Sequence, residues 1–260
     1  MKLAVVTGIA RCTGIGHAIC DVLLEGGLAV IGLDLNPLEA SSFLPTKYPH
    51  QFRSRICRVD SDPINLHQQL NEKAFLPTDD AETNEEMALT RLIARLEEYD
   101  KYIQNNMRSA FLVTEVCRQY FPPPNPGVTP LLSRPSASII HISSTRALAS
   151  EFGPKYCQEG YASAKAGLLG LTHAQGQSMA RLARVNVILP GWIDTEDHGN
   201  GGYIPSDVDH GWHTTGRVGN PRDVAQMVAF LADDEKSGFI TCQEFTIDGG
   251  VSKRMHYPET

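Results

Sequence analysis

The sequence lacks any hydrophobic run long enough to cross a membrane. Its longest strongly apolar stretch, residues 28–33, has six residues and includes a glycine. A transmembrane helix needs about 20 such residues, so we expect none. The first residues turn polar too early for a secretion signal. Basic residues are also too few for a nucleic-acid partner, because 23 Lys and Arg stand against 30 Asp and Glu, a net charge of −7.

Cysteines are present but form no recognisable site. The six cysteines are spread along the chain, and no pair has the Cys-x-x-Cys spacing of a zinc or redox site. We therefore expect reduced thiols in a cytoplasmic protein. A length of 260 residues, 42% of them hydrophobic and 20% charged, predicts one domain over residues 1–260 with a buried core.

Short apolar segments alternate with helical patterns along most of the chain. We expect strands at 3–6, 28–33, 56–59, 138–142, 185–189 and 239–247, and helices at 17–25, 97–119, 160–182 and 221–232. This alternation predicts an α/β fold, in which a Rossmann-like doubly wound parallel sheet has helices on both faces. Such sheets bind ligands at the carboxyl ends of their strands. Residues 61–97 are atypical, because no convincing strand is found there.

A glycine-rich turn follows the first expected strand and opens the first helix. Gly8, Gly14 and Gly16 allow the backbone to turn tightly and approach a pyrophosphate, while the helix start offers N–H groups and a favourable dipole. Asp34 ends the second strand. Its carboxylate can bind an adenosine ribose and repel a 2′-phosphate, which favours NAD over NADP. Arg11 leaves the alternative open, because it lies inside the turn and can meet a 2′-phosphate.

Tyr161 and Lys165 are four residues apart in an expected helix and therefore share one face. A lysine ammonium near a phenol favours the phenolate and lowers its pKa, which is ordinarily about 10. Tyr161 is thus a candidate general acid/base. Ser144 ends the preceding strand, where a hydroxyl can hydrogen-bond a substrate carbonyl oxygen. A plain pair on a surface helix is the alternative interpretation of Tyr161 and Lys165.

Taken in order, these motifs resemble those of the short-chain dehydrogenase/reductase family. The matching pieces are the turn at 7–16, Asp60, the segment 142–144, Tyr161 with Lys165, the segment 190–195, and a C-terminal signature at 217–223 and 239–250. The resemblance covers most of the chain outside 61–97. It implies the family's single Rossmann-like domain.

The resemblance implies a catalytic tetrad of Asn106, Ser144, Tyr161 and Lys165. Asn106 would hold a water for proton relay, and Ser144 would orient the substrate carbonyl. Tyr161 would transfer the hydroxyl proton, and Lys165 would tune Tyr161 and bind the nicotinamide ribose. Besides Tyr161 and Lys165, the expected cofactor-binding residues are Gly8, Arg11, Gly14, Ile15, Gly16, Asp34, Asp60, Pro190, Gly191, Ile193 and Thr195.

These observations lead us to expect an NAD(H)-dependent alcohol dehydrogenase or carbonyl reductase, with NADP the less favoured cofactor. The substrate would be a small secondary alcohol or ketone. The resemblance further implies a homotetramer or homodimer formed through the helices at 97–119 and 160–182. Neither nucleic acid nor a membrane is expected as a partner.

Three departures from the family pattern leave a second function open. Five residues separate Gly8 from Gly14, more than is usual, and extra residues precede Tyr161 around 152–158. The family's Asn-Asn-Ala-Gly segment, which ends its fourth strand, has no counterpart between Asp60 and Asn106. The alternative is therefore a non-redox isomerase or cyclase, or a binding protein, whose dinucleotide binding is weakened or lost.

Residues 196–215 follow the Pro-Gly motif and correspond to the family's substrate lid. His198, His210 and His213 lie there among acidic residues. Histidines with acids can form a metal site, but we favour a mobile lid with substrate contacts and expect no metal.

Overall fold

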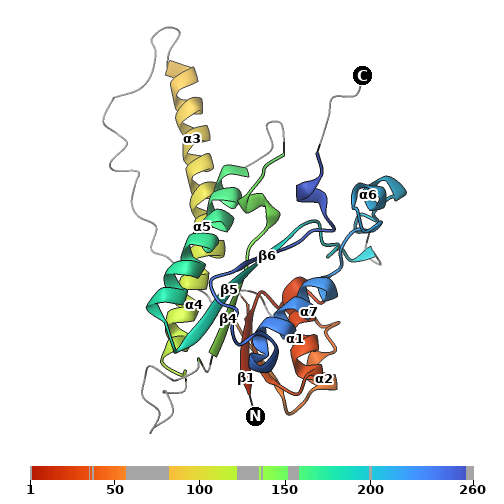
Figure 1. The fold of residues 1–260 in the computed structure, drawn as a ribbon. Coiled ribbons are helices and arrows are strands. Elements are labelled where there is room, and N and C mark those ends of the chain that lie inside the picture. The colour runs from red at the N-terminus through yellow and green to blue at the C-terminus, as the bar shows by residue number, and fades with distance from the viewer. Residues whose placement is uncertain are drawn as a thin grey trace.

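The computed structural model describes residues 2–34, 36, 38–56, 82–121, 135, 137–151, 158–198 and 201–255. Its strands form two three-stranded parallel sheets (Figure 1). The first sheet has the order β1 (Leu3–Thr7), β2 (Ala29–Asp34), β3 (Phe52–Ile56), and the second the order β4 (Ala137–Ile142), β5 (Ala183–Pro190), β6 (Glu244–Ile247). Parallel pairing throughout confirms the predicted α/β class.

Helices cover both faces of the second sheet. The longer ones are α1 (Ile15–Glu25), α3 (Glu82–Ile103), α4 (Ser109–Arg118), α5 (Gln158–Ser178) and α7 (Pro221–Ala232). Helix α5 packs on β5 beside α3, whereas α7 packs on β4 and β5 beside α1, as Figure 1 shows. The short helices are α2 (Leu44–Lys47), α6 (Asp207–Trp212) and α8 (Asp234–Ser237), with 3-10 turns at Thr145–Ala147 and Val251–Lys253.

Helix α7 occupies the range predicted from the sequence, and its N-terminus shows why. The side chain of Asn220 accepts hydrogen bonds from the backbone N–H groups of Arg222 and Asp223, at 3.0 and 3.2 Å. The Asp223 carboxylate in turn accepts the N–H of Asn220 at 2.8 Å. This reciprocal capping box, followed by Pro221 in the first turn, is a local signal that fixes where the helix begins.

The third and last strands differ from the prediction. Strand β3 lies at Phe52–Ile56 and not at 56–59, of which 57–59 fall outside the described residues. Arginines at alternate positions conceal this strand in the sequence, although Phe52 is buried. Strand β6 covers only Glu244–Ile247 because Cys242 has a φ of 58°, in the left-handed region, and cannot continue an extended strand.

The helices predicted at 97–119 and 160–182 also have different limits. The first is two α-helices, α3 and α4, joined by the π-helical turn η2 (Gln104–Arg108). The second, α5, ends at Ser178, and Arg181 beyond it has a left-handed φ of 71°. A non-glycine residue in that conformation cannot belong to an α-helix.

The buried core joins the two sheets. Val6 of β1, Val30 of β2 and Leu23 of α1 belong to the same hydrophobic cluster as Val224 of α7 and Ile188 of β5. This cluster holds the carboxyl ends of β1 and β5 in one body. Among the described residues, no helix is both long and apolar enough to cross a membrane.

Candidate active site

The glycine turn connects β1 to α1 with very little space. Gly8 has a φ of 72°, and a Cβ on Gly16 would lie 2.1 Å from the carbonyl oxygen of Gly8. Both positions therefore need glycine. Gly14 begins α1 and contributes no side-chain cap, in contrast to Asn220 of α7. The N–H groups of the first turn of α1 are thus left for an anion, so the turn fits the pyrophosphate of a dinucleotide.

Two carboxylates hold the enlarged turn from the side of β2. Asp34 accepts the backbone N–H of Ala10 at 2.8 Å, and Glu39 accepts the N–H of Cys12 at 2.8 Å. The backbone N–H of Glu39 also donates to the carbonyl of Ala10 at 3.0 Å. Asp34 was predicted to lie in the cofactor site. Glu39 was missed, because only the fold brings it to Cys12.

The turn also touches the segment that follows β5. The hydroxyl of Thr13 donates to the carbonyl of Thr195 at 2.6 Å, and the guanidinium of Arg11 donates to the same oxygen at 3.3 Å. The structure therefore places Thr195 beside the turn. It directs Arg11 at Thr195.

The segment from Pro190 to Thr195 is fixed by backbone pairing with the C-terminal part of the chain. The N–H of Gly191 donates to Ile247 at 2.8 Å, and a Cβ on Gly191 would lie 2.6 Å from the Asp248 side chain. Ile193 forms an isolated parallel bridge with Gly219. The hydrogen bonds of this bridge join Gly219 to the backbone groups of the residues just before and just after Ile193. The N–H and C=O of Ile193 itself consequently face away from Gly219.

Tyr161 and Lys165 lie on α5 beside the end of β4. The ammonium of Lys165 donates to the carbonyl of Ile142 at 3.0 Å and lies 5.5 Å from the centre of the Tyr161 ring. The hydroxyl of Ser143 donates to the carbonyl of Lys165 at 2.8 Å. Burial lowers the pKa of Lys165 to about 8. These hydrogen bonds fix α5 to the end of β4. Ser144 lies directly after this strand end.

Ser144 begins the short turn Thr145–Ala147 and accepts the N–H of Arg146 at 3.2 Å. Arg146 donates to Gln158 at 2.9 Å and forms an ion pair with Glu151. This cluster flanks the segment before α5. The insertion predicted around 152–158 lies outside the described residues except for Gln158.

Asn106 lies in the π-helical turn η2, and its amide donates to the carbonyl of Tyr102 at 3.0 Å. The Tyr102 ring meets the Tyr161 ring edge to face, with centroids 5.8 Å apart. Met107 packs so closely on Gly167 that a Cβ there would lie 2.3 Å from its sulfur. The turn is therefore fitted against α5. Isolated π turns occur often at functional sites.

Tyr102 thus connects two residues of the expected tetrad, although the sequence did not single it out. Its position four residues before Asn106 was the available signal, because residues at this spacing are neighbours in a helix. Asp60, expected to contact the adenine, lies outside the described residues.

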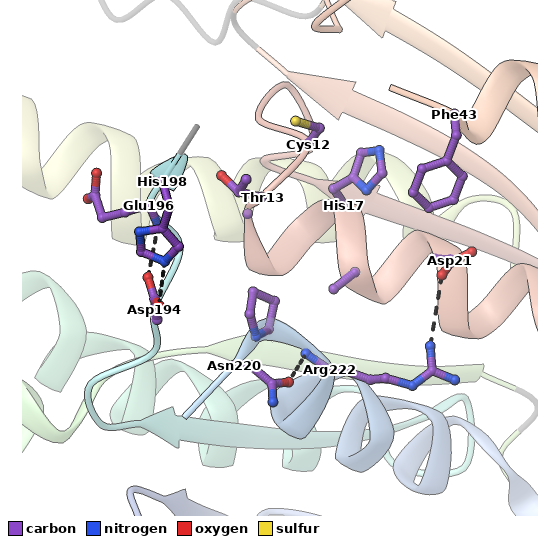
Figure 2. A pocket seen from close by; sticks show the side chains of 13 residues that line it. Cys12, Thr13, His17, Asp21, Phe43, Asp194, Glu196, His198, Asn220 and Arg222 are labelled. Carbon is purple, nitrogen blue, oxygen red and sulfur yellow. Dashed lines mark hydrogen bonds and ion pairs between the residues drawn. The ribbon is translucent and has the colours of Figure 1, made fainter. Parts of the chain in front are cut away.

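A cavity of about 390 Å³ opens beside the glycine turn (Figure 2), and Tyr161 is not among the residues that line it. Its walls are Thr13 of the turn, His17 and Asp21 of α1, the start of α7, and Asp194 with His198. The side chains of His198 and Asp194 are hydrogen-bonded, with Nε2 and Oδ2 2.8 Å apart.

Aromatic rings of the expected lid pack on Trp192, which lies just before it. Trp192 stacks on Tyr203, with ring centroids 6.2 Å apart, and lies equally far from the ring of His213. Asp209 accepts hydrogen bonds from Tyr203 and Ser206, which starts α6. No group of three or more potential metal ligands gathers in the part of the chain that the structure describes.

Known proteins are similar to this chain over nearly its full length. The family described as Enoyl-(Acyl carrier protein) reductase matches residues 81–252. An oxidoreductase of Thermotoga maritima, itself uncharacterized, is 31% identical over 268 aligned residues, covering 99% of this chain and 98% of that protein. A 3-oxoacyl-(acyl-carrier-protein) reductase of the same organism is 28% identical, covering 96% of this chain and 97% of its own.

A solved structure agrees with these matches. The apo form of a SCOR enzyme from Clostridium thermocellum superimposes with a TM-score of 0.68 at 28% identity, covering 98% of this chain and 95% of its own.

Proposed function

The chain belongs to the short-chain dehydrogenase/reductase family, and on that premise we propose that it is an NAD(H)-dependent enzyme interconverting a secondary alcohol and a ketone. Membership of the family implies an oxidoreductase with a nicotinamide dinucleotide cofactor. The observation that carries the proposal is the arrangement around α5. Tyr161 and Lys165 lie at the end of β4, with Asn106 linked to them through Tyr102.

In this proposal, each residue of the tetrad has a separate task. Tyr161 gives a proton to, or takes it from, the oxygen at the reacting carbon, and Ser144 donates a hydrogen bond to that oxygen. Lys165 stabilises the phenolate of Tyr161 and holds the nicotinamide ribose, while Asn106 orders a water that relays protons. When bound, the nicotinamide supplies or accepts the hydride.

The remaining cofactor contacts follow the chain from the turn to the lid. Gly8, Gly14, Ile15 and Gly16 bind the pyrophosphate at the start of α1. The carboxamide is held by the backbone of Ile193 and the hydroxyl of Thr195, in the segment that begins with Pro190 and Gly191.

Preference for NAD is supported by the surroundings of Asp34. One oxygen of Asp34 accepts the N–H of Ala10, and the other accepts the N–H of Asn36 at 3.0 Å. Each carboxylate oxygen can accept two hydrogen bonds, so Asp34 is still able to accept ribose hydroxyls. Arg11, the residue that favoured NADP, is directed at the carbonyl of Thr195.

Substrate class is proposed from the relatives. The 3-oxoacyl-(acyl-carrier-protein) reductase that resembles this chain is named for reducing the 3-oxo group of an acyl chain carried on acyl carrier protein. The first compounds to assay are therefore 3-oxoacyl thioesters, followed by simple ketones and secondary alcohols. We further propose that the chain forms a homo-oligomer through α3, α4 and α5, where Leu92, Phe111 and Val116 are exposed.

The proposal is tested by titrating NADH and NADPH separately, followed by turnover of the Tyr161→Phe variant. We expect NADH to bind more tightly. The variant should keep its NADH affinity within a factor of about two and lose about 10²–10⁴-fold in kcat, the usual range for a general acid/base. Tyr120→Phe is the matched control, because Tyr120 is 77% exposed and lies after α4.

Two results would contradict this proposal. Turnover that survives in Tyr161→Phe removes Tyr161 from the proton transfer. Failure to bind either dinucleotide favours the non-redox alternative, whereas tighter binding of NADPH overturns the argument from Asp34.

A further inference from the structure

The enlarged glycine turn is held by acidic side chains at alternate residues. The N–H of Ala10 donates to Asp34, and the N–H of Cys12 donates to Glu39, both at 2.8 Å. We call Asp34 and Glu39 the carboxylate clamp. The turn has five residues between its first two glycines, and Cys12 is one of them. The second carboxylate therefore meets the part of the turn that departs from the usual family spacing.

Glu39 is fixed in this place by more than its carboxylate. Its backbone N–H donates to the carbonyl of Ala10 at 3.0 Å, so main chain and side chain contact the turn two residues apart. The neighbouring Ser41 donates to the sulfur of Cys12 at 3.3 Å. The segment after β2 thus runs along the turn, and the Glu39 carboxylate cannot swing away without breaking its bond to Cys12.

The charge on Glu39 persists at neutral pH. Hydrogen bonds from Cys12 are the main cause that holds the pKa of Glu39 below its ordinary value, and the positive charge of Arg11 adds to them. Asp197 adds another negative charge nearby. An anion that approaches this side of the turn therefore meets carboxylates.

Positive charge near the clamp is scarce. Within the described part of the turn, Arg11 is the single cationic side chain, and its guanidinium donates to the carbonyl of Thr195. His17 at the start of α1 is buried, and burial lowers its pKa, so it is neutral. Few positive charges are therefore available to offset the repulsion between the carboxylate clamp and another negatively charged group.

We propose that Glu39 is a specificity-determining residue, a second carboxylate that excludes dinucleotides carrying a 2′-phosphate at the adenosine ribose. This inference rests on the proposed function, which places the adenosine at the end of β2 beside Asp34. Asp34 contacts the ribose hydroxyls in that function. Glu39 acts on the same end of the cofactor by charge and by holding the turn at Cys12.

The test compares Glu39→Gln with the wild type by measuring the Kd of NADH and of NADPH in the full chain. Glutamine keeps the length and an oxygen that can accept the N–H of Cys12, but it removes the charge. We expect the ratio of the NADPH Kd to the NADH Kd to fall about tenfold, as expected of charges a few ångströms apart under partial solvent screening. The NADH Kd itself should change less than about twofold.

Salt distinguishes a charge effect from a merely structural one. The difference between Glu39→Gln and the wild type should shrink between low salt and about 1 M salt, where the screening length is about 3 Å. Glu235→Gln serves as the matched control, because Glu235 is an exposed acid on α8, and it should leave the ratio unchanged. Glu39→Ala, which also removes the acceptor for Cys12, should weaken the binding of both dinucleotides.

The outcomes separate this inference from the proposed function. A wild-type chain that binds neither dinucleotide, or prefers NADPH, contradicts the proposed function before any variant is measured. A wild type that prefers NADH, together with an unchanged ratio in Glu39→Gln, overturns the role of Glu39 alone. The same is true if the ratio shifts equally at low and high salt.

Discussion

The two sheets carry different parts of the proposed site, and their side chains are buried to different degrees. All eight residues of β5, between β4 and β6, are buried. Strand β1 lies at the edge of the other described sheet, and its Leu3 and Val5 are 62% and 39% exposed. The sheet below the tetrad thus depends on packing from both faces. The glycine turn above β1 depends more on hydrogen bonds that it donates to Asp34, Glu39 and Thr195.

Arg184→Ala should have the largest effect on the free energy of unfolding, because it breaks the packed sheet. Arg184 on β5 is 2% exposed, donates to Asp234 at 2.8 Å and donates to the carbonyls of Leu231 and Ile240. Loss of a large buried side chain and its hydrogen bonds should cost about 3 kcal/mol. Urea unfolding of both proteins measures this difference.

The control for Arg184 is an exposed ion pair. Arg95 and Glu159 join α3 to α5, with side chains 73% and 67% exposed. Arg95→Ala should cost less than about 0.5 kcal/mol, because water screens exposed pairs. Equal losses in the two variants would mean that burial does not distinguish the sheet around β5.

Gly16→Ala should have the next largest effect, and on the turn more than on the core. The added Cβ would lie 2.1 Å from the carbonyl oxygen of Gly8, which is backbone and cannot rotate away. We expect a loss of about 1–3 kcal/mol in stability from overpacking. The Kd of NADH, measured by nicotinamide fluorescence, should also rise. The rise should be larger than the loss of folding stability alone would cause.

Gly170→Ala is the matched control for Gly16. Gly170 lies within α5, and a Cβ there would have nothing within 4 Å. Alanine should raise the free energy of unfolding by up to about 1 kcal/mol, because alanine has a higher helix propensity than glycine. If Gly16→Ala also raised the free energy of unfolding, the turn would not need Gly16 to lie so close to the carbonyl oxygen of Gly8.

The last comparison concerns the pH dependence of stability in the absence of dinucleotide. Burial lowers the pKa of Lys165 from 10.5 to about 8, so between these values the unfolded chain binds more protons than the folded one. Stability contributed by this group therefore rises with pH across that window, with a slope of at most about 1.4 kcal/mol per pH unit. Below pH 8 the cost of burying the charge is fully present.

Lys165→Met should abolish that rise. Burial also raises the pKa of the Cys20 thiol to about 12, which lowers stability as pH increases above 9, so the wild type and the variant must be compared at each pH. Lys253→Met, at an exposed site, should retain the wild-type slope. Parallel curves for wild type and Lys165→Met would show that Lys165 is not desolvated.

Much of the fold and part of the candidate site could be predicted because their signals are local in the chain. The glycine turn, the capping box of Asn220 and Asp223, and the spacing of Tyr161 and Lys165 each involve residues a few positions apart. The helix limits around 103–109 were missed, because the apolar pattern continues through the π turn. Strand β3 was misplaced, because charged residues alternate along it.

The sequence by itself determined the α/β alternation, the residues able to do the chemistry and the family that they resemble. Only the tertiary structure decided which distant groups meet. Glu39 reaches Cys12 from 27 residues away, and Thr13 reaches Thr195 from 182 residues away. Such contacts leave no periodic trace in a sequence, because they depend on how the strands and helices pack. The tertiary structure therefore decided that Arg11 faces Thr195 and that a second carboxylate accompanies Asp34.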